Sequence, residues 1–171
     1  MAETDTRVAH PFAPVWDENS RALVLGTFPS VQSRLSGFYY GHPQNRFWQA
    51  LAALCASPVP ATVKQKRALL LDHGVALWDV LARCDIRGSA DATIRNAEPN
   101  DIAALLHKAP IAAVFANGQA AAALYRRYAE PITGLAVNAL PSTSPANAVW
   151  TLPRLVEAWQ PLGAYIQKPA P

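Results

Sequence analysis

The chain has 171 residues, and its hydrophobic content of 51% is enough for one compact domain with a full core. No apolar run approaches the roughly 18 residues of a membrane span, and the acidic first residues lack the apolar centre of a secretory signal. A net charge of +3 permits nucleic-acid binding without arguing strongly for it, so we expect a cytoplasmic protein whose single domain covers residues 1–171.

Apolar runs and turn residues predict strands that alternate with helices. Residues 1–20 are polar and contain prolines, which indicates an arm leading into a first strand at about 21–25. The elements expected after it are a helix at 45–55, a helix at 63–73 capped by Thr62, a strand at 75–78, an irregular stretch at 79–99, a helix from Asn100 or Asp101 to 107, a strand at 111–115, a helix at 119–128, a strand at 135–140 and a helix from Thr151 to about 159. Such alternation implies parallel crossovers, so we expect a three-layer α/β/α sandwich with a central parallel sheet of about four strands.

The loop after the first predicted strand is the most informative segment. Ligands of open α/β sheets bind at the carboxyl ends of the strands, which is where this loop begins. It combines aromatic rings with hydroxyl and amide groups, in Phe28, Ser30, Gln32, Ser33, Phe38, Tyr39, Tyr40 and Asn45. A core segment does not need the polar groups, and a solvated loop does not need the rings. The mixture therefore predicts a pocket that stacks a flat, hydrogen-bonding ligand such as a nucleobase.

Three motifs resemble the uracil-DNA glycosylase superfamily. Gly26-Thr-Phe-Pro-Ser30, followed by Phe38-Tyr-Tyr-Gly-His-Pro-Gln-Asn-Arg-Phe-Trp48, is similar to its hypoxanthine-DNA glycosylase branch, which is related to the mismatch-specific uracil-DNA glycosylases. Gly74-Val-Ala-Leu-Trp-Asp79 lies where the superfamily has a base-reading strand end, and Leu140-Pro-Ser-Thr-Ser-Pro-Ala146 lies where it has a DNA-inserting loop. The resemblance implies the uracil-DNA glycosylase fold. It also implies a monomeric, monofunctional enzyme of base excision repair that removes deaminated bases, hypoxanthine first, from double- or single-stranded DNA.

The resemblance gives four residues a role in base binding. Tyr40 aligns with a stacking aromatic residue, with Phe28 and Tyr39 as its neighbours; the alternative is that these rings only fill the core. Asp79 falls where other branches place an asparagine. An ionised carboxylate accepts hydrogen bonds but does not donate them, so Asp79 would favour the N1–H of hypoxanthine and repel the N1 lone pair of adenine. The alternative is that Asp79 caps the turn at 80–82.

The catalytic group is predicted at an unusual place. Most branches carry a catalytic Asp or Asn at the third position of Gly-Thr-Phe-Pro, where this chain has Phe28. The resemblance to the hypoxanthine branch points instead to Asn45. An amide orients water but does not take its proton at neutral pH, so such a mechanism depends on leaving-group quality and electrostatics. The alternative is that Asn45 only caps the helix that follows it.

Two proline-containing loops are candidates for DNA contacts. Ser30, Ser142 and Ser144 are expected to present hydroxyl and backbone amide groups to phosphates. Residues Thr143 to Asn147 are expected to form the wedge that fills the hole left by an extruded nucleotide. A rigid proline turn is the alternative. The segment with Ser89 and Asp91 also resembles the hypoxanthine branch, but it receives no chemical role, and Asn117 is interpreted as a turn residue.

Cofactors are not expected. The two cysteines, Cys55 and Cys84, lack metal-site spacing and are too few for an iron–sulfur cluster, and His10, His73 and His107 share no ligand spacing. Two other functions stay open at this point. In the first, the protein is a glycosylase that prefers uracil, xanthine or another lesion. In the second, it is a non-catalytic module that binds nucleic acid or nucleotides and lost catalysis with the polar residue at position 28.

Overall fold

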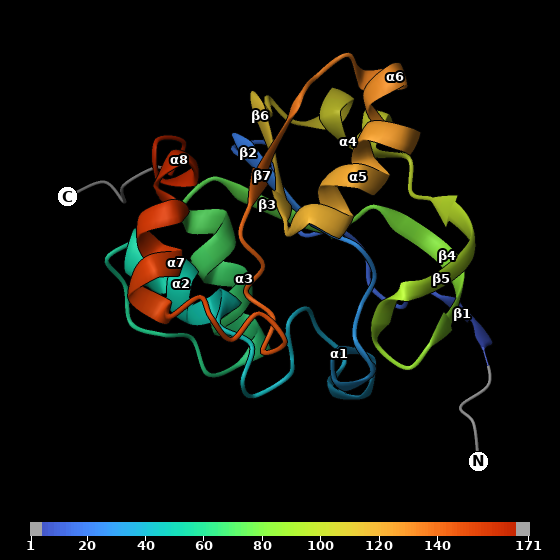
Figure 1. Ribbon diagram of the computed structural model, residues 1–171. Helices are drawn as coiled ribbons and strands as arrows, with labels where there is room; N and C mark the ends of the chain where they lie inside the picture. The colour runs from blue at the N-terminus through green and yellow to red at the C-terminus, as the bar shows by residue number, and fades with distance from the viewer. Residues whose placement is uncertain (1–4, 167–171) are drawn as a thin grey trace.

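A computed structural model describes residues 5–166, which form two sheets and their flanking helices (Figure 1). The strands are β1 (Thr6–Ala9), β2 (Ala22–Gly26), β3 (Val75–Asp79), β4 (Leu81–Arg87), β5 (Ala90–Pro99), β6 (Ala113–Asn117) and β7 (Val137–Leu140). The helices are α1 (Val31–Ser36), α2 (Phe47–Leu54), α3 (Val63–Asp72), α4 (Ile102–Lys108), α5 (Gln119–Tyr128), α6 (Glu130–Thr133), α7 (Leu152–Ala158) and α8 (Gln160–Gly163).

The central sheet is parallel, with the strand order β3-β2-β6-β7. Helices α4, α5 and α6 lie on one side of it, and α2, α3, α7 and α8 lie on the other (Figure 1). This is the three-layer α/β/α sandwich that the sequence predicts, with the expected four strands. Within the described part of the chain, no helix is long and apolar enough to cross a membrane.

Both faces of the central strand β2 are buried, which explains its unbroken apolar run. Successive side chains of a strand point to opposite faces. Leu23 and Leu25 accordingly pack in the hydrophobic cluster that includes Tyr125 of α5. Val24 packs in the other cluster, with Leu51 of α2.

The second sheet corrects two expectations. Residues 79–99 were expected to be irregular but form the β4–β5 hairpin, and the first residues were expected to be an arm although Thr6–Ala9 pairs with β4 as an edge strand. Three register shifts interrupt the β4–β5 pairing, so the hairpin lacks the strict alternation by which a strand is predicted. Residues 1–4 of the predicted arm lie outside the described residues.

The helix ends agree more closely with the predictions. Thr62 forms a capping box with Gln65, and Asp101 and Thr151 cap α4 and α7 through their side chains. Helix α1 was not expected, because its six residues are too few for a helical apolar period. Ser30 begins this helix by accepting a hydrogen bond from the Ser33 backbone N–H at 3.1 Å.

Candidate functional site

A cavity of about 150 Å³ lies at the carboxyl ends of the parallel strands. A cavity of this volume is able to hold a benzene-sized ring. All four predicted base-binding residues line it, together with the three predicted serines, in the set Gly26, Thr27, Phe28, Pro29, Ser30, Ser33, Tyr39, Tyr40, Asp79, Ser89, Asp91, Asn117, Ser142 and Ser144. The structure thus brings residues from four strand ends and the hairpin to one place.

The aromatic residues of the cavity have different surroundings. The Tyr39 hydroxyl donates to the backbone oxygen of Ala13 at 2.9 Å, so this ring is fixed against the N-terminal segment. The Tyr40 ring stacks on Phe47 with centroids 4.2 Å apart, and its backbone adopts the left-handed conformation, with φ of 52°. One face of Tyr40 is therefore covered. Its role as the stacking residue for a base stays a prediction.

The Tyr40 hydroxyl is buried and has no hydrogen-bond partner among the described residues. Burial above all, and then the charge of Asp79, raise the pKa of Tyr40, while the Asn117 side chain opposes the shift. The hydroxyl is therefore neutral at physiological pH and keeps its proton to donate. An unpaired buried hydroxyl on a cavity wall is suited to a polar ligand atom.

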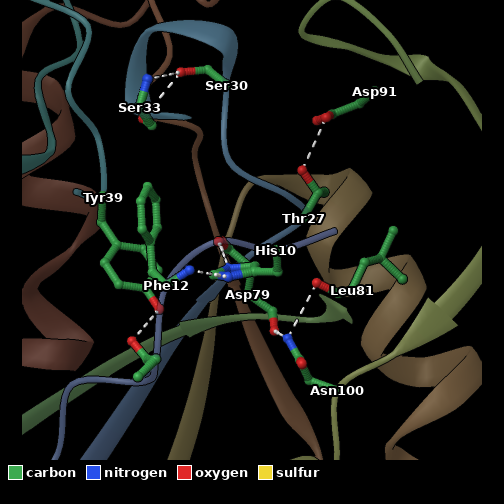
Figure 2. A network of polar contacts seen from close by, with 11 residues as sticks. His10, Phe12, Thr27, Ser30, Ser33, Tyr39, Asp79, Leu81, Asp91 and Asn100 are labelled. Carbon is green, nitrogen blue, oxygen red and sulfur yellow. Dashed lines mark hydrogen bonds and ion pairs between the residues drawn. The ribbon is translucent and has the colours of Figure 1, made fainter. Parts of the chain in front are cut away.

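Asp79 is held by a residue that the sequence did not assign. The His10 Nε2 atom lies 2.7 Å from Asp79 Oδ2, and both side chains are only 4–5% exposed (Figure 2). The Phe12 backbone N–H donates to His10 Nδ1 at 3.1 Å, so that nitrogen is an acceptor and the proton of a neutral imidazole is on Nε2. His10 thus donates to Asp79, which stays an acceptor.

The alternative role of Asp79 as a turn cap is excluded. The backbone N–H groups of Val80 and Leu81 donate to the backbone oxygens of Gly26 and Thr27 instead. Gly26 is needed here because a Cβ atom at this position would lie 2.4 Å from Asp79 Oδ1 and 3.1 Å from the Tyr40 hydroxyl oxygen. The free carboxylate oxygen of Asp79 and the free hydroxyl of Tyr40 therefore face the same small region.

Asn45 lies outside the cavity lining. Its Oδ1 atom accepts hydrogen bonds from the Phe47 backbone N–H at 2.9 Å and from the Thr143 hydroxyl at 2.8 Å. The first bond supports the start of α2, but the N-cap of this helix is Arg46, which makes no side-chain capping bond, so Asn45 is not the helix cap of the alternative. Its Nδ2 atom has no hydrogen bond to a described residue and remains able to hold a water molecule. The catalytic role of Asn45 stays a prediction.

Thr143 is fully buried, which corrects its assignment to the exposed wedge. The side chain of Asn117 donates to its hydroxyl at 3.0 Å and accepts from its backbone N–H at 3.0 Å. The Arg46 backbone N–H donates to the Thr143 carbonyl oxygen at 3.1 Å. Thr143 therefore anchors the loop from inside, and Asn117 has a structural role beyond that of a turn residue.

The loop at 141–150 is also held by the Arg46 guanidinium. Its Nη2 atom donates to the carbonyl oxygens of Ser144 at 2.9 Å and Asn147 at 3.2 Å, and Nη1 donates to that of Trp150. Three carbonyl groups of one loop thus converge on one side chain that the sequence did not single out. The sequence points to Arg46 only indirectly, because this residue lies in the same motif as Asn45.

An open groove adjoins the cavity, with a volume of about 730 Å³. Its lining consists of Ser89, Ala90, Asp91, Gln119, Ala139, Pro141, Ser142, Ser144, Ala146, Asn147 and Trp150. The predicted wedge residue Asn147 therefore faces this groove rather than the cavity. The groove is formed by the loop at 141–150 and the β4–β5 hairpin.

Asp91 lies on the hairpin, in the lining of both the cavity and the groove. Its Oδ1 atom accepts a hydrogen bond from the Thr27 hydroxyl at 2.9 Å (Figure 2). The residue is exposed on the hairpin, but partial desolvation of its carboxyl group raises the pKa of Asp91; the Thr27 hydrogen bond lowers this pKa, and the charge of Asp79 raises it. The sequence comparison drew attention to this segment without giving Asp91 a role.

No group of three or more His, Cys, Asp or Glu residues able to hold a metal ion occurs within residues 5–166. The amino acids at the cavity instead supply rings, hydroxyl groups, amides and two carboxyl groups. Such a set is able to bind a flat polar ligand and to act on a water molecule.

Comparison with known proteins identifies the family. Residues 13–163 match the model of the uracil DNA glycosylase superfamily. The chain belongs to the uracil DNA glycosylase superfamily.

Two relatives come from species of Methanosarcina. The chain is 33% identical over 141 residues to the hypoxanthine DNA glycosylase of Methanosarcina acetivorans, covering 80% of this chain and 86% of the relative. It is 34% identical over 110 residues to the hypoxanthine DNA glycosylase of Methanosarcina barkeri, covering 63% of this chain and 70% of the relative.

A solved structure supports the same fold. A solution NMR structure from Methanosarcina acetivorans, provisionally described as a uracil DNA glycosylase, superposes with a TM-score of 0.76 and 29% identity. The alignment covers 94% of this chain and 96% of that one. The three-layer architecture and the superfamily predicted from the sequence are therefore confirmed.

Proposed function

We propose that this protein is a monofunctional DNA glycosylase of base excision repair that hydrolyses the N-glycosidic bond of hypoxanthine in DNA. The observation that carries this proposal is the pairing of two free groups at the end of the cavity. Asp79 Oδ1 is an acceptor, and the Tyr40 hydroxyl is a neutral donor. Both lie close to the position that a Cβ atom on Gly26 would occupy.

This pair complements one edge of hypoxanthine. The base presents an N1–H donor beside an O6 acceptor, so Asp79 accepts from N1–H while Tyr40 donates to O6. This role at the edge of the base replaces the stacking role predicted for Tyr40. Adenine presents the reverse pattern and would leave both protein groups unpaired, which costs about 1–3 kcal/mol for each buried group. Uracil shares the donor and acceptor pattern of hypoxanthine at N3–H and O4. Preference for uracil, xanthine or another lesion is therefore the second candidate function.

The DNA strand is proposed to lie along the groove beside the cavity. A glycosylase extrudes its target nucleotide, so the base enters the cavity while the backbone stays in the groove. Ser30, Ser142 and Ser144 are placed to contact phosphate groups, and the exposed part of the loop from Ser144 to Asn147 is proposed to enter the duplex. We expect action on double- and single-stranded DNA by a cytoplasmic monomer.

The water that attacks the sugar is proposed to be oriented in part by Asn45, through its free Nδ2 atom. No lysine among the described residues lines the cavity or the groove. An amine nucleophile is thus not supplied there, and cleavage of the DNA backbone by a lyase step is not part of the proposal.

A duplex with a single deoxyinosine tests the function. We expect free hypoxanthine and an abasic site that breaks only after alkaline treatment, with no product from the same duplex carrying adenine. Tight binding without an abasic site would favour the non-catalytic binding module. A product only from uracil or xanthine duplexes would favour the second candidate.

A further inference from the structure

The cavity and the groove meet at four residues. Ser89 and Asp91 of the hairpin and Ser142 and Ser144 of the loop at 141–150 line both spaces. If the base occupies the cavity and the sugar and phosphates lie in the groove, the bond that joins base to sugar lies where the two spaces meet. The residues of this junction are therefore the ones that face the reacting bond.

Asp91 is the one junction residue with an ionisable carboxyl group, since a serine hydroxyl is far too weak a base. The Asn45 amide orients water but does not take a proton at neutral pH. Asp79 lines the cavity but not the groove, and one of its oxygens is occupied by His10. Among the described residues, the geometry therefore leaves one carboxylate beside the scissile bond.

Several hydrogen bonds hold the hairpin over the cavity. The Val31 backbone N–H donates to the Ser89 hydroxyl at 2.9 Å, and Arg34 donates to the Gly88 carbonyl oxygen at 3.3 Å. The Thr27 hydroxyl fixes Asp91 Oδ1, which leaves Oδ2 without a hydrogen bond to a described residue. Figure 2 shows Asp91 approaching Thr27 from the hairpin, apart from the Asp79–His10 pair. The free oxygen is thus presented by a fixed carboxyl group.

We propose that Asp91 is a catalytic residue that accepts a proton from the attacking water. The water oxygen forms a bond to the anomeric carbon while the bond from that carbon to the base nitrogen breaks, and the electron pair of that bond leaves with the base. The water proton passes to Asp91 Oδ2, and the departing base takes a proton from solvent. The same negative charge stabilises the positive charge that develops on the sugar. This inference rests on the proposed function and deepens it.

The charges around Asp91 determine the pH at which it acts. The titratable groups near it are the Asp79 carboxylate of β3, the neutral Tyr40 hydroxyl and the Arg34 guanidinium, which binds the hairpin turn. Partial desolvation, with the charge of Asp79, raises the pKa of Asp91 above the ordinary value of an aspartate. The carboxyl must lose its proton before it acts as a base, so the cleavage rate rises as the pH rises through this pKa.

The test is single-turnover cleavage of the deoxyinosine duplex by wild type and by Asp91→Asn, across a range of pH. Asparagine keeps the acceptor for Thr27 but does not take a proton. We expect the rate to fall by about a hundredfold or more, the contribution of a positioned general base, and the rising limb of the pH profile to disappear. Affinity for the lesion duplex should be unchanged or higher, because the variant lacks a negative charge near the phosphates.

Glu98→Gln is the matched control. It removes a carboxylate from the same strand, where Glu98 pairs with Arg7 and Arg83 away from the cavity. Its rate and pH profile should equal those of wild type. An Asp91→Asn variant that cleaves at the wild-type rate, or slowly with an unchanged pH profile, would overturn the catalytic role of Asp91 but leave the function standing. A wild-type protein inactive on every lesion duplex would overturn both.

Discussion

At the scale of single residues, the site depends on His10 as much as on Asp79. A buried carboxylate is stable only when its oxygens have donors. His10 supplies one donor, and its own tautomer is fixed by the Phe12 backbone N–H. The His10–Asp79 pair fixes the direction of the carboxylate and leaves its Oδ1 atom for the ligand. In the proposed function, base selection by Asp79 thus depends on a histidine that lies far from it in the sequence.

Replacing His10 by alanine is expected to affect both stability and catalysis. The Asp79 carboxylate would lose the hydrogen bond that it accepts from His10, and a bond to an ionised group contributes about 1.5–3 kcal/mol to the free energy of unfolding. Chemical denaturation checks this loss, and cleavage of the deoxyinosine duplex should also slow because Asp79 is no longer oriented. The exposed His107 provides the control, since His107→Ala should change neither. Equal behaviour of the two variants would contradict the role of His10.

Asn45→Ala separates the two roles of this side chain. The loss of the hydrogen bond that Asn45 Oδ1 accepts from the Phe47 backbone N–H should cost about 1 kcal/mol of stability, as for a typical hydrogen bond within a protein. If its Nδ2 atom also orients the water, the single-turnover rate should fall by roughly a hundredfold. A wild-type rate in a folded variant would reduce Asn45 to the support of α2 and Thr143.

The raised pKa of Asp91 is expected to lower the stability of the folded protein at neutral pH. Its pKa is higher in the folded than in the unfolded protein, so its contribution to stability is present below the unfolded value and is lost as the pH rises through the folded value. Asp91→Asn should therefore unfold at a higher temperature than wild type at neutral pH. The difference should vanish below about pH 3.9, the ordinary pKa of aspartate. Thermal unfolding at both pH values measures this, and a variant less stable than wild type at neutral pH would contradict it.

At the scale of elements, the loop at 141–150 is a rigid structure. Thr143 fixes it from the inside, and Arg46 binds three of its carbonyl groups. The Asn147 side chain also donates to the Ser142 carbonyl oxygen at 2.9 Å. A loop that must enter a duplex is most effective when its shape is fixed before it binds, because little conformational entropy is then lost.

Arg46→Gln should release this loop. We expect activity on duplex DNA to fall more than activity on single strands, because only a duplex has a hole to fill. Arg154→Gln is the control, since Arg154 donates to a single carbonyl of the loop, that of Val149, at 3.0 Å. Equal losses on both substrates would contradict the assignment of the loop to duplex insertion.

The elements also show how far the sequence was informative. The caps at Thr62, Asp101 and Thr151 are local chemistry, so they and their helices were predictable. The β4–β5 hairpin was not, because its register shifts remove the period of two. Burial of Thr143 was not predictable either, since a serine- and proline-rich segment gives no sign that one of its side chains turns inward toward Asn117.

At the scale of the whole molecule, the parallel sheet brings distant segments to one edge. The loop after Gly26 was predicted to line a pocket because it follows a strand, and the family resemblance gave the motifs around Asp79 and Ser142 a part in the same site. Residues of all three motifs line the cavity. The second sheet adds what the motifs did not contain. It carries Asp91, and the segment after β1 carries His10, so the two groups that complete the site depend on pairing between the N-terminus and the hairpin. Such pairing is a tertiary contact that no local pattern encodes.

The base selectivity of Asp79→Asn shows whether Asp79 recognises the edge of the base. Wild type and variant are compared on matched duplexes that carry hypoxanthine, uracil or adenine opposite the same base. An amide turns either way, so the variant should lose its penalty against bases with an acceptor at the position of N1. The rate for hypoxanthine relative to adenine should therefore fall about ten- to a hundredfold, while the ratio of hypoxanthine to uracil should change less. Unchanged selectivity on all three duplexes would place Asp79 outside base recognition and contradict the account.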